Sequence, residues 1–146
     1  MIPSDAVTVR PADWQHQPDI DLLRAIRRRV FIEEQEVPES LEWDEFDAVS
    51  LHVLAETVSG EAVATGRLLP DGHIGRMAVL REWRGRGMGL TVLQTLLAAA
   101  RQRGDRIVRL NAQTHALGFY EKAGFLAEGP VFDDAGIPHR TMSRRL

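Results

Sequence analysis

The sequence predicts a mixed α/β domain built on one central sheet, and three observations predict this class. The chain has 146 residues, the length of one ordinary domain, with 44% apolar and 27% charged residues. Segments that alternate like strands are interspersed with segments whose apolar residues recur at helical spacing. Glycines and prolines separate these segments into the order strand, helix, three strands, helix, strand, helix and two strands. We therefore expect residues 1–146 to form a single domain.

The chain begins with a short strand and a helix. Residues 6–10 alternate in polarity, and Pro11 ends the predicted strand. Residues 19–31 predict an amphipathic helix, with Asp19 and Asp21 at its positive end. Its apolar face carries Leu22, Leu23, Ile26 and Val30. The opposite, polar face is expected to carry most of Arg24, Arg27 and Arg28.

An acidic stretch and three consecutive strands follow. Residues 33–50 contain Pro38 and show no clean period, so they predict a loop with at most one helical turn. Residues 51–57 and 62–69 predict a hairpin across Ser59-Gly60. A turn then leads into the third predicted strand, at residues 73–80.

The C-terminal half alternates between helices and strands. Residues 88–103 keep a period of 3.6, and Gly104 is a natural terminator. Gly124 closes a shorter predicted helix in the same way. The other elements are expected at residues 107–110 (strand), 114–123 (helix), and 125–127 and 141–144 (closing strands around a turn at 133–138).

Composition excludes several classes of function. The chain has no cysteine, so disulfides, thiolate metal sites and a cysteine nucleophile are excluded. The five histidines show no His-x-x-x-His pair, and we expect no metal. The net charge of −3 argues against a nucleic-acid partner. Residues 1–5 show no signal-peptide pattern and residues 96–100 are too short to cross a bilayer, so we expect a cytoplasmic protein without a membrane partner.

The most informative segment is Arg84-Gly85-Arg86-Gly87-Met88-Gly89, which follows a predicted strand and opens a helix. The first turn of a helix leaves backbone N–H groups without partners, and the helix dipole adds positive potential there. Glycines let a phosphate approach the backbone, and arginines supply fork-shaped donors for its oxygens. The segment therefore indicates an anion site, although a plain glycine-rich turn with exposed arginines is the alternative.

Two familiar nucleotide loops do not fit this turn. A triphosphate loop would end in Gly-Lys-Ser/Thr, and the dinucleotide fingerprint G-x-G-x-x-G has a different spacing. The pattern R-x-x-G-x-G, which spans Arg84, Gly87 and Gly89, resembles instead the coenzyme A pyrophosphate motif of the GNAT acetyltransferases.

A second segment strengthens the resemblance. Residues 111–125, NAQTHALGFYEKAGF, are similar to the second GNAT signature, with Gln113 where the family usually has Asn. Residues 30–35, 43–47, His52 and 136–139 resemble the ElaA-like branch. The resemblance implies the GNAT fold, a mixed and mostly antiparallel sheet of six to seven strands flanked by three to four helices.

The resemblance also implies an activity. It is the direct transfer of an acetyl group from acetyl-CoA, as co-substrate, to a primary amine of a small molecule or peptide, without a covalent intermediate. Tyr120 would protonate the departing thiolate, and a backbone N–H between Met77 and Val79 would polarise the thioester carbonyl. The expected cofactor-binding residues are Met77, Ala78, Val79, Arg84, Gly85, Arg86, Gly87, Met88, Gly89, Gln113, Phe119 and Tyr120. A homodimer is possible by base rate alone.

The sequence leaves the general base and the non-enzymatic alternatives open. An amine acceptor must lose a proton before it attacks, so a base or a water chain is needed. The candidates are Glu33, Glu34, Asp47, His52, His115 and His139, of which Glu34 and His115 are preferred. The acidic loop 33–47 suggests attraction for a cationic acceptor. A regulatory module that binds acyl-CoA without transfer remains the main alternative function.

Overall fold

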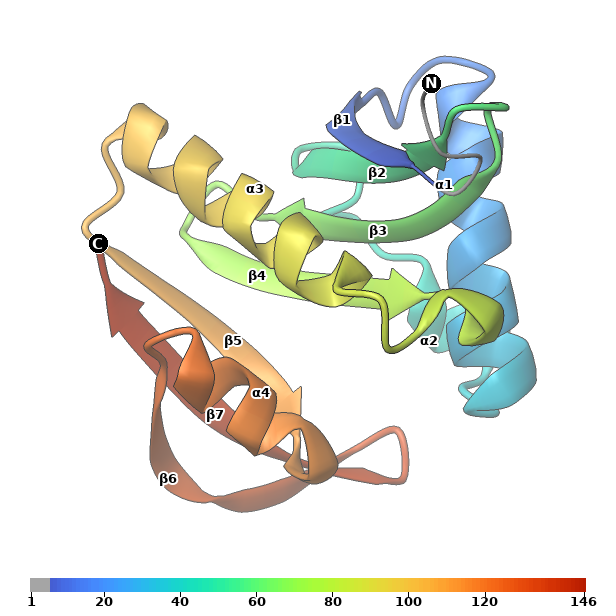
Figure 1. Cartoon of the computed structure of the whole chain (residues 1–146). Coiled ribbons are helices and arrows are strands. Elements are labelled where there is room, and N and C mark those ends of the chain that lie inside the picture. The colour runs from blue at the N-terminus through green and yellow to red at the C-terminus, as the bar shows by residue number, and fades with distance from the viewer. Residues whose placement is uncertain (1–5) are drawn as a thin grey trace.

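A computed structural model describes residues 6–146 as one seven-stranded sheet with helices on both faces (Figure 1). Residues 1–5, in which we saw no signal peptide, lie outside the described residues. The strands are β1 Val7–Ala12, β2 Leu51–Thr57, β3 Ala62–Leu68, β4 His73–Val79, β5 Ile107–Gln113, β6 Leu126–Asp134 and β7 Ile137–Arg145. The helices are α1 Asp19–Arg27, α2 Glu39–Glu42, α3 Met88–Arg103 and α4 Leu117–Lys122. A π-helical segment spans Arg28–Glu34, and 3₁₀ turns span Arg81–Trp83 and Thr114–Ala116.

The predicted class and element order are confirmed. The sheet has the order β1-β2-β3-β4-β5-β7-β6, and all neighbours are antiparallel except β4 and β5. β1 extends past Pro11 to Ala12, contrary to prediction, because β1 is an edge strand and can tolerate a residue without an N–H. β6 and β7 have nine residues each and are longer than expected, since they pair along most of their length.

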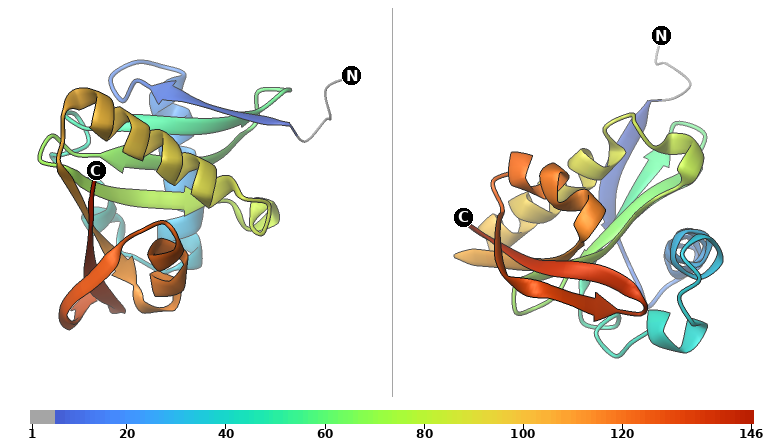
Figure 2. Two further views of the ribbon diagram at one scale, coloured as in Figure 1. Left: turned by 60° about the vertical axis from the view of Figure 1, so that its left-hand side comes forward. Right: turned by 90° about the horizontal axis from the view of Figure 1, so that it is seen from below.

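α1 covers one face of the sheet, and α3 and α4 cover the other (Figure 2). α1 and α3 both pack on β3, where Gly66 permits the close approach of α3. A Cβ at Gly66 would lie 2.9 Å from side-chain atoms of both Val92 and Leu96. In the described part of the chain, no helix is both long and apolar enough to cross a membrane.

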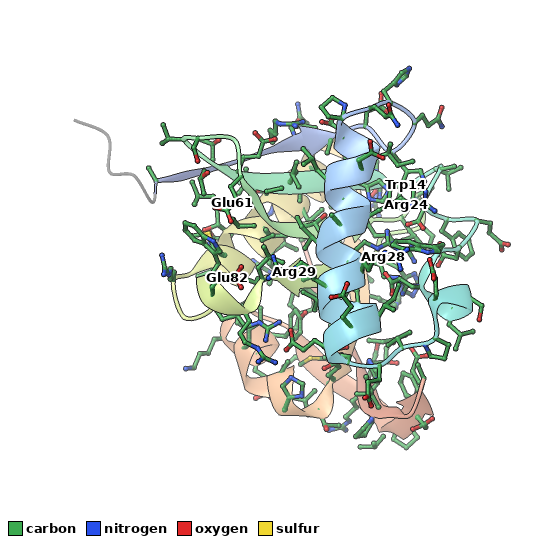
Figure 3. The ribbon with its side chains drawn as sticks, turned by 90° about the vertical axis from the view of Figure 1, so that its right-hand side faces the viewer. Trp14, Arg24, Arg28, Arg29, Glu61 and Glu82 are labelled. Carbon is green, nitrogen blue, oxygen red and sulfur yellow. The ribbon has the colours of Figure 1, made fainter. Side chains whose placement is uncertain are left out.

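The first helix departs from prediction on its polar face. α1 ends at Arg27, and the chain continues as the π-helical segment to Glu34 instead of ending near Phe31. Arg27 is only 1% exposed, although its helical position predicted the polar face. The reason is tertiary, because Arg27 Nε donates to Glu42 Oε2 at 2.7 Å and Arg27 Nη1 donates to Asp47 Oδ1 at 2.7 Å. Arg28 and Arg29, by contrast, lie on the outside, where Arg29 meets Glu82 at 3.1 Å (Figure 3).

β4 and β5 open the sheet. The first two residues of β4 pair with the third and fourth residues of β5, His73 with Arg109 and Ile74 with Leu110, and no pairing continues toward the C-terminal ends of the two strands. The register of β4 against β3 also shifts beside Arg76, whose φ of 48° lies in the left-handed region. Figure 1 shows the two strands diverging from this paired end. The carboxyl ends of β4 and β5 therefore frame an opening in the sheet.

Candidate active site

A cleft of about 1050 Å³ lies in this opening and along the adjoining wall of the sheet. It is lined by β4, the ends of β5 and β7, the π-helical segment and the α2 loop. Ten of the residues proposed from sequence line it: Glu34, Met77, Ala78, Val79, Arg84, Gln113, His115, Phe119, Tyr120 and His139. The glycines of the turn 85–89 are not among its lining residues. The structure thus brings the β4 strand and the second motif together.

The edge of β4 presents a free backbone donor to the cleft. Leu80 N–H donates to Val63 O at 3.0 Å, so the backbone of Leu80 faces β3. Backbone groups alternate sides along a strand, and the groups of Val79 therefore face the opening. The Val79 carbonyl agrees with this, because it accepts a 3.0 Å bond from Arg84 Nε on that side. The same alternation turns Ala78 towards β3 and so removes it from the predicted range of Met77 to Val79 for a carbonyl-polarising N–H. Of the two that remain, Val79 is the one whose orientation is supported by hydrogen bonds at its own carbonyl and at the neighbouring Leu80.

The glycine-rich turn adopts a conformation that other residues rarely enter. Gly85 and Gly87 have φ of 77° and 81°, in the left-handed region, and Gly87 precedes the first turn of α3. Added Cβ atoms at either position would meet nothing within 4 Å, so the space in front of the turn is open. Arg86 extends over the Trp83 ring at 4.6 Å and is exposed. The turn thus offers free N–H groups at a helix N-terminus beside a flexible guanidinium.

Arg84 is held by Glu34. Arg84 donates two bonds to the Glu34 carboxylate, at 2.6 and 2.8 Å, in addition to its bond to Val79. The pairing with Arg84 holds the pKa of Glu34 below its usual range. A carboxylate held in this way is a poor proton acceptor at neutral pH. Glu34 therefore acts on the site by orienting Arg84, and the geometry does not favour it as the general base.

Tyr120 reaches the cleft from α4. Its hydroxyl lies 3.7 Å from Met77 Sδ, a weak acceptor, and its ring packs edge-on against Phe119 and Phe125. Burial raises the pKa of Tyr120 to about 12, so the phenol stays protonated at physiological pH. Its O–H is therefore available as a donor to whatever fills the opening beside β4.

The other residues proposed from the second motif differ in how firmly they are held. Gln113 Nε2 donates to Gln35 Oε1 at 3.0 Å and so joins β5 to the segment after the π-helical turn. Phe119 lies 3.5 Å from the Cβ position of Gly89, which joins α4 to the start of α3. His115 is exposed at the rim, on the 3₁₀ turn before α4.

Two of the proposed base candidates make hydrogen bonds and ion pairs in the protein interior instead. His52 is buried and bonds through Nε2 to Asp47 O at 2.8 Å, as expected for a core histidine. Asp47 is itself bonded to Arg27 and Arg67 at 2.7 and 2.8 Å. Neither side chain lines the cleft, so neither is placed to receive a proton from an acceptor there.

The sequence missed a cluster of charged residues under the cleft. Arg67 Nη1 bonds Asp44 Oδ1 at 2.7 Å, and Arg76 Nη2 lies 3.2 Å from Asp44 Oδ2. Together with the contacts of Arg27, these bonds form a buried ion-pair network of three arginines and three carboxylates. Its members are Arg27, Arg67, Arg76, Glu42, Asp44 and Asp47. Helical or strand periodicity carries no signal for partners that are 15 to 34 residues apart.

This network bears on the expectation for the acidic loop. We predicted that residues 33–47 attract a cationic acceptor, and three of their carboxylates, Glu42, Asp44 and Asp47, are paired with arginines. Charges neutralised at contact distance project little potential into the cleft. The attraction of a cationic acceptor to this loop stays a prediction. Within residues 6–146, no group of three or more metal-binding side chains is arranged to hold an ion.

The comparisons with known proteins agree with the fold and the cleft. A family model described as an acetyltransferase (GNAT) domain matches residues 16–146. The uncharacterized N-acetyltransferase YjcF of Bacillus subtilis (strain 168) is 38% identical over 124 residues, covering 82% of this chain and 87% of the relative. The crystal structure of Escherichia coli ElaA is 28% identical, with a TM-score of 0.83 over 95% of this chain and 99% of that one.

A more distant structure shares the fold. A GNAT family acetyltransferase from Elizabethkingia anophelis, with acetyl-CoA bound, has 17% identity and a TM-score of 0.70 over 97% of this chain and 99% of its own. The chain belongs to the GNAT acetyltransferase family, as its two motifs predicted.

Proposed function

We propose that this protein transfers the acetyl group of acetyl-CoA directly to a primary amine. The observation that carries the proposal is the opening between β4 and β5, where the free backbone side of Val79 and the hydroxyl of Tyr120 meet one cleft. The chain has no cysteine that could carry the acetyl group as a thioester. Direct attack by the acceptor amine on the thioester carbon is therefore the favoured route.

Two parts of the chain would bind acetyl-CoA: the turn before α3 and the open edge of β4. The pyrophosphate would lie against the N-terminal turn of α3, where Gly85, Gly87 and Gly89 admit it close to the backbone and Arg86 adds charge. The pantetheine arm would extend along the open edge of β4 toward Val79. The acetyl-CoA bound to the Elizabethkingia relative supports a ligand of this class in the shared fold.

The chemistry follows from two groups of this chain. The N–H of Val79 would stabilise the negative charge that develops on the carbonyl oxygen as the amine nitrogen bonds to the carbonyl carbon. When the C–S bond then breaks, Tyr120 would donate its proton to the thiolate. The raised pKa of Tyr120 suits this order of events, because the phenol keeps its proton until a strong local base appears.

Calorimetric titration with acetyl-CoA tests the binding half of the proposal. Saturable binding is expected for the native sequence, and Gly87→Glu is expected to abolish it by placing a carboxylate in front of the phosphate turn. Gly60→Glu is the matched control, since Gly60 has a similar φ of 88° with open space around it but lies in the β2–β3 turn. If both variants lose binding equally while folded, the turn is not the phosphate site.

Release of free CoA with a panel of primary amines tests transfer. A thiol reagent reads CoA without background because the protein contributes no cysteine. Binding of acetyl-CoA without amine-dependent CoA release from any panel member would favour the regulatory acyl-CoA-binding module over an enzyme.

A further inference from the structure

His139 lies at the cleft on β7, and its backbone places it beside the proposed reaction centre. It is the pairing partner of Gln113 at the end of β5 and of Phe132 on β6. Side chains alternate along strands, so His139 shares a face with Gln113, while Ala112 and Leu110 point into the core on the side of α4. His139 therefore lies on the opposite face of β5 and β7 from α4, the helix that carries Tyr120. We take the face with His139 as the side from which the acceptor amine approaches, and call it the acceptor side.

The tautomer of His139 is set by its neighbour. Its Nδ1 lies 2.7 Å from Ile137 O, and a carbonyl oxygen can only accept, so Nδ1 must carry the proton. In the neutral imidazole, Nε2 is then an acceptor with a free lone pair. In residues 6–146 no side chain or backbone group bonds this Nε2.

The ring is also held in place. It stacks on Phe132 with centroids 6.0 Å apart and planes 24° from parallel, and His139 is 9% exposed. A side chain fixed by stacking and by one hydrogen bond needs little reorganisation when a substrate arrives.

The other titratable groups of the cleft are occupied or unsupported. Glu34, Glu42 and Asp44 are ion-paired with arginines. His73 lies at the paired start of β4, with its Nδ1 3.0 Å from Asp71 Oδ1. Asp134 and His115 are exposed, and no side-chain hydrogen bond is described that would hold either of them in place.

We infer that His139 is the general base that deprotonates the acceptor amine, through Nε2. This inference rests on the proposed acetyl transfer and assigns its missing proton acceptor. An ammonium acceptor loses two protons in becoming an amide. One passes to His139 Nε2 and then to solvent, and the other replaces the proton that Tyr120 gives to the CoA thiolate. The Ile137 carbonyl stabilises the imidazolium formed at this step.

The experiment compares two amines that differ in their need for a base, and scores each by the ratio of the variant's rate to the native rate so that their other differences cancel. Benzylamine is mostly protonated at neutral pH, whereas methoxyamine is unprotonated. His139→Gln is expected to lower kcat/KM for benzylamine by roughly 10²-fold, the usual contribution of a positioned base, and to change methoxyamine turnover far less. His16→Gln is the matched control, because His16 is exposed between β1 and α1 and does not line the cleft, and it should keep native rates with both amines.

The pH profile gives a second readout. The native enzyme should lose activity with benzylamine as the pH falls, because a protonated base cannot take a proton, and His139→Gln should lose this dependence. The charged or titratable groups on the elements packed against His139 are Glu128, Asp133 and Asp134 on β6, Arg109 on β5 and His115 on the 3₁₀ turn. If His115→Gln removes the acidic limb and His139→Gln keeps it, the base is His115 and the inference is wrong.

Two further measurements separate this inference from the proposed function. Acetyl-CoA affinity of His139→Gln should equal that of the native chain, because the histidine lies on the acceptor side. A protein that binds no acetyl-CoA contradicts the acetyltransferase proposal as a whole. Nitrogen chemical shifts of His139 should show the Nδ1–H tautomer, and an Nε2–H tautomer in the free protein would overturn the base role alone.

Discussion

The two walls of the cleft use polar residues in opposite ways. The wall built from α1, the α2 loop and the strands β3 and β4 holds three arginines and three carboxylates that bond one another. The wall built from β5, β7 and α4 presents Tyr120 and His139, whose reactive atoms have at most a weak protein partner. Satisfied polar groups make a rigid scaffold, whereas unsatisfied ones are left for a ligand.

The largest expected effect comes from the removal of Arg27, the central cation of the ion-pair network. Arg27→Met should destabilise the protein by about 3–5 kcal/mol, because it leaves Glu42 and Asp47 buried without their main counter-ion. Urea unfolding measures the change. Arg28→Met is the control, since Arg28 makes an exposed pair with Glu39 one position along the same helix, and it should show no measurable change. Similar losses in both variants would mean that the network is not the scaffold.

The next largest effect is expected in the wall built from β5, β7 and α4, and it is an effect on the reaction rate instead of on stability. Tyr120→Phe should lower kcat by roughly 10²-fold while leaving acetyl-CoA affinity unchanged, because the phenyl ring keeps the packing with Phe119 and Phe125. Steady-state CoA release and calorimetry measure the two quantities. Unchanged turnover at saturating substrates would remove the tyrosine from the mechanism.

The ion-pair network should also make the free energy of unfolding depend on pH in acid. Burial pushes the pKa of Asp47 upward, but the bonds from Arg27 outweigh it, and the pKa of Asp44 is lowered by Arg67 against a similar desolvation. Folded-state pKa values below the unfolded value of about 3.9 mean that stability is full above about pH 4 and is lost as the pH falls further.

The slope of stability against pH is the measurable quantity. Each carboxylate with a lowered pKa contributes up to about 1.4 kcal/mol per pH unit in that window. Glu42 opposes them, because burial raises its pKa. Asp47→Asn should therefore flatten the acid limb measured by urea unfolding at several pH values. An unchanged slope would show that Asp47 does not carry it.

The smallest expected effect lies where the two walls touch. Gln113 Nε2 bonds Gln35 Oε1 across the cleft, and Gln113→Ala should cost about 0.5–1.5 kcal/mol, the worth of one hydrogen bond. Thermal unfolding measures this loss. Gln35→Ala should give a similar loss, and the double variant should add little, since both remove the same bond. Full additivity would show that the bridge does not join the walls in solution.

The local chemistry of the chain determined much of this protein. The glycines at 85, 87 and 89 identify the turn before α3, because glycine enters the left-handed conformations seen at 85 and 87 far more readily than other residues. The periods of residues 51–57 and 88–103 fixed those elements within a residue or two, since each buries one face or stripe. The glycine spacing and the hydrophobic periods are both patterns among residues close together in the chain, and such local patterns can be read directly from a sequence.

Tertiary structure decided what each polar side chain could do. Arg27 has the helical position of a surface residue and became the centre of a buried network, because carboxylates from a distant loop met it there. Glu34 lines the cleft, but its carboxylate is paired with Arg84, which leaves it poorly suited to accept a proton. The tautomer of His139 depends on the carbonyl of Ile137, two residues earlier at the start of β7. The sequence determines which titratable side chains a protein contains. Their protonation, and whether they are already hydrogen-bonded, depend on partners that only the folded chain brings within hydrogen-bonding distance.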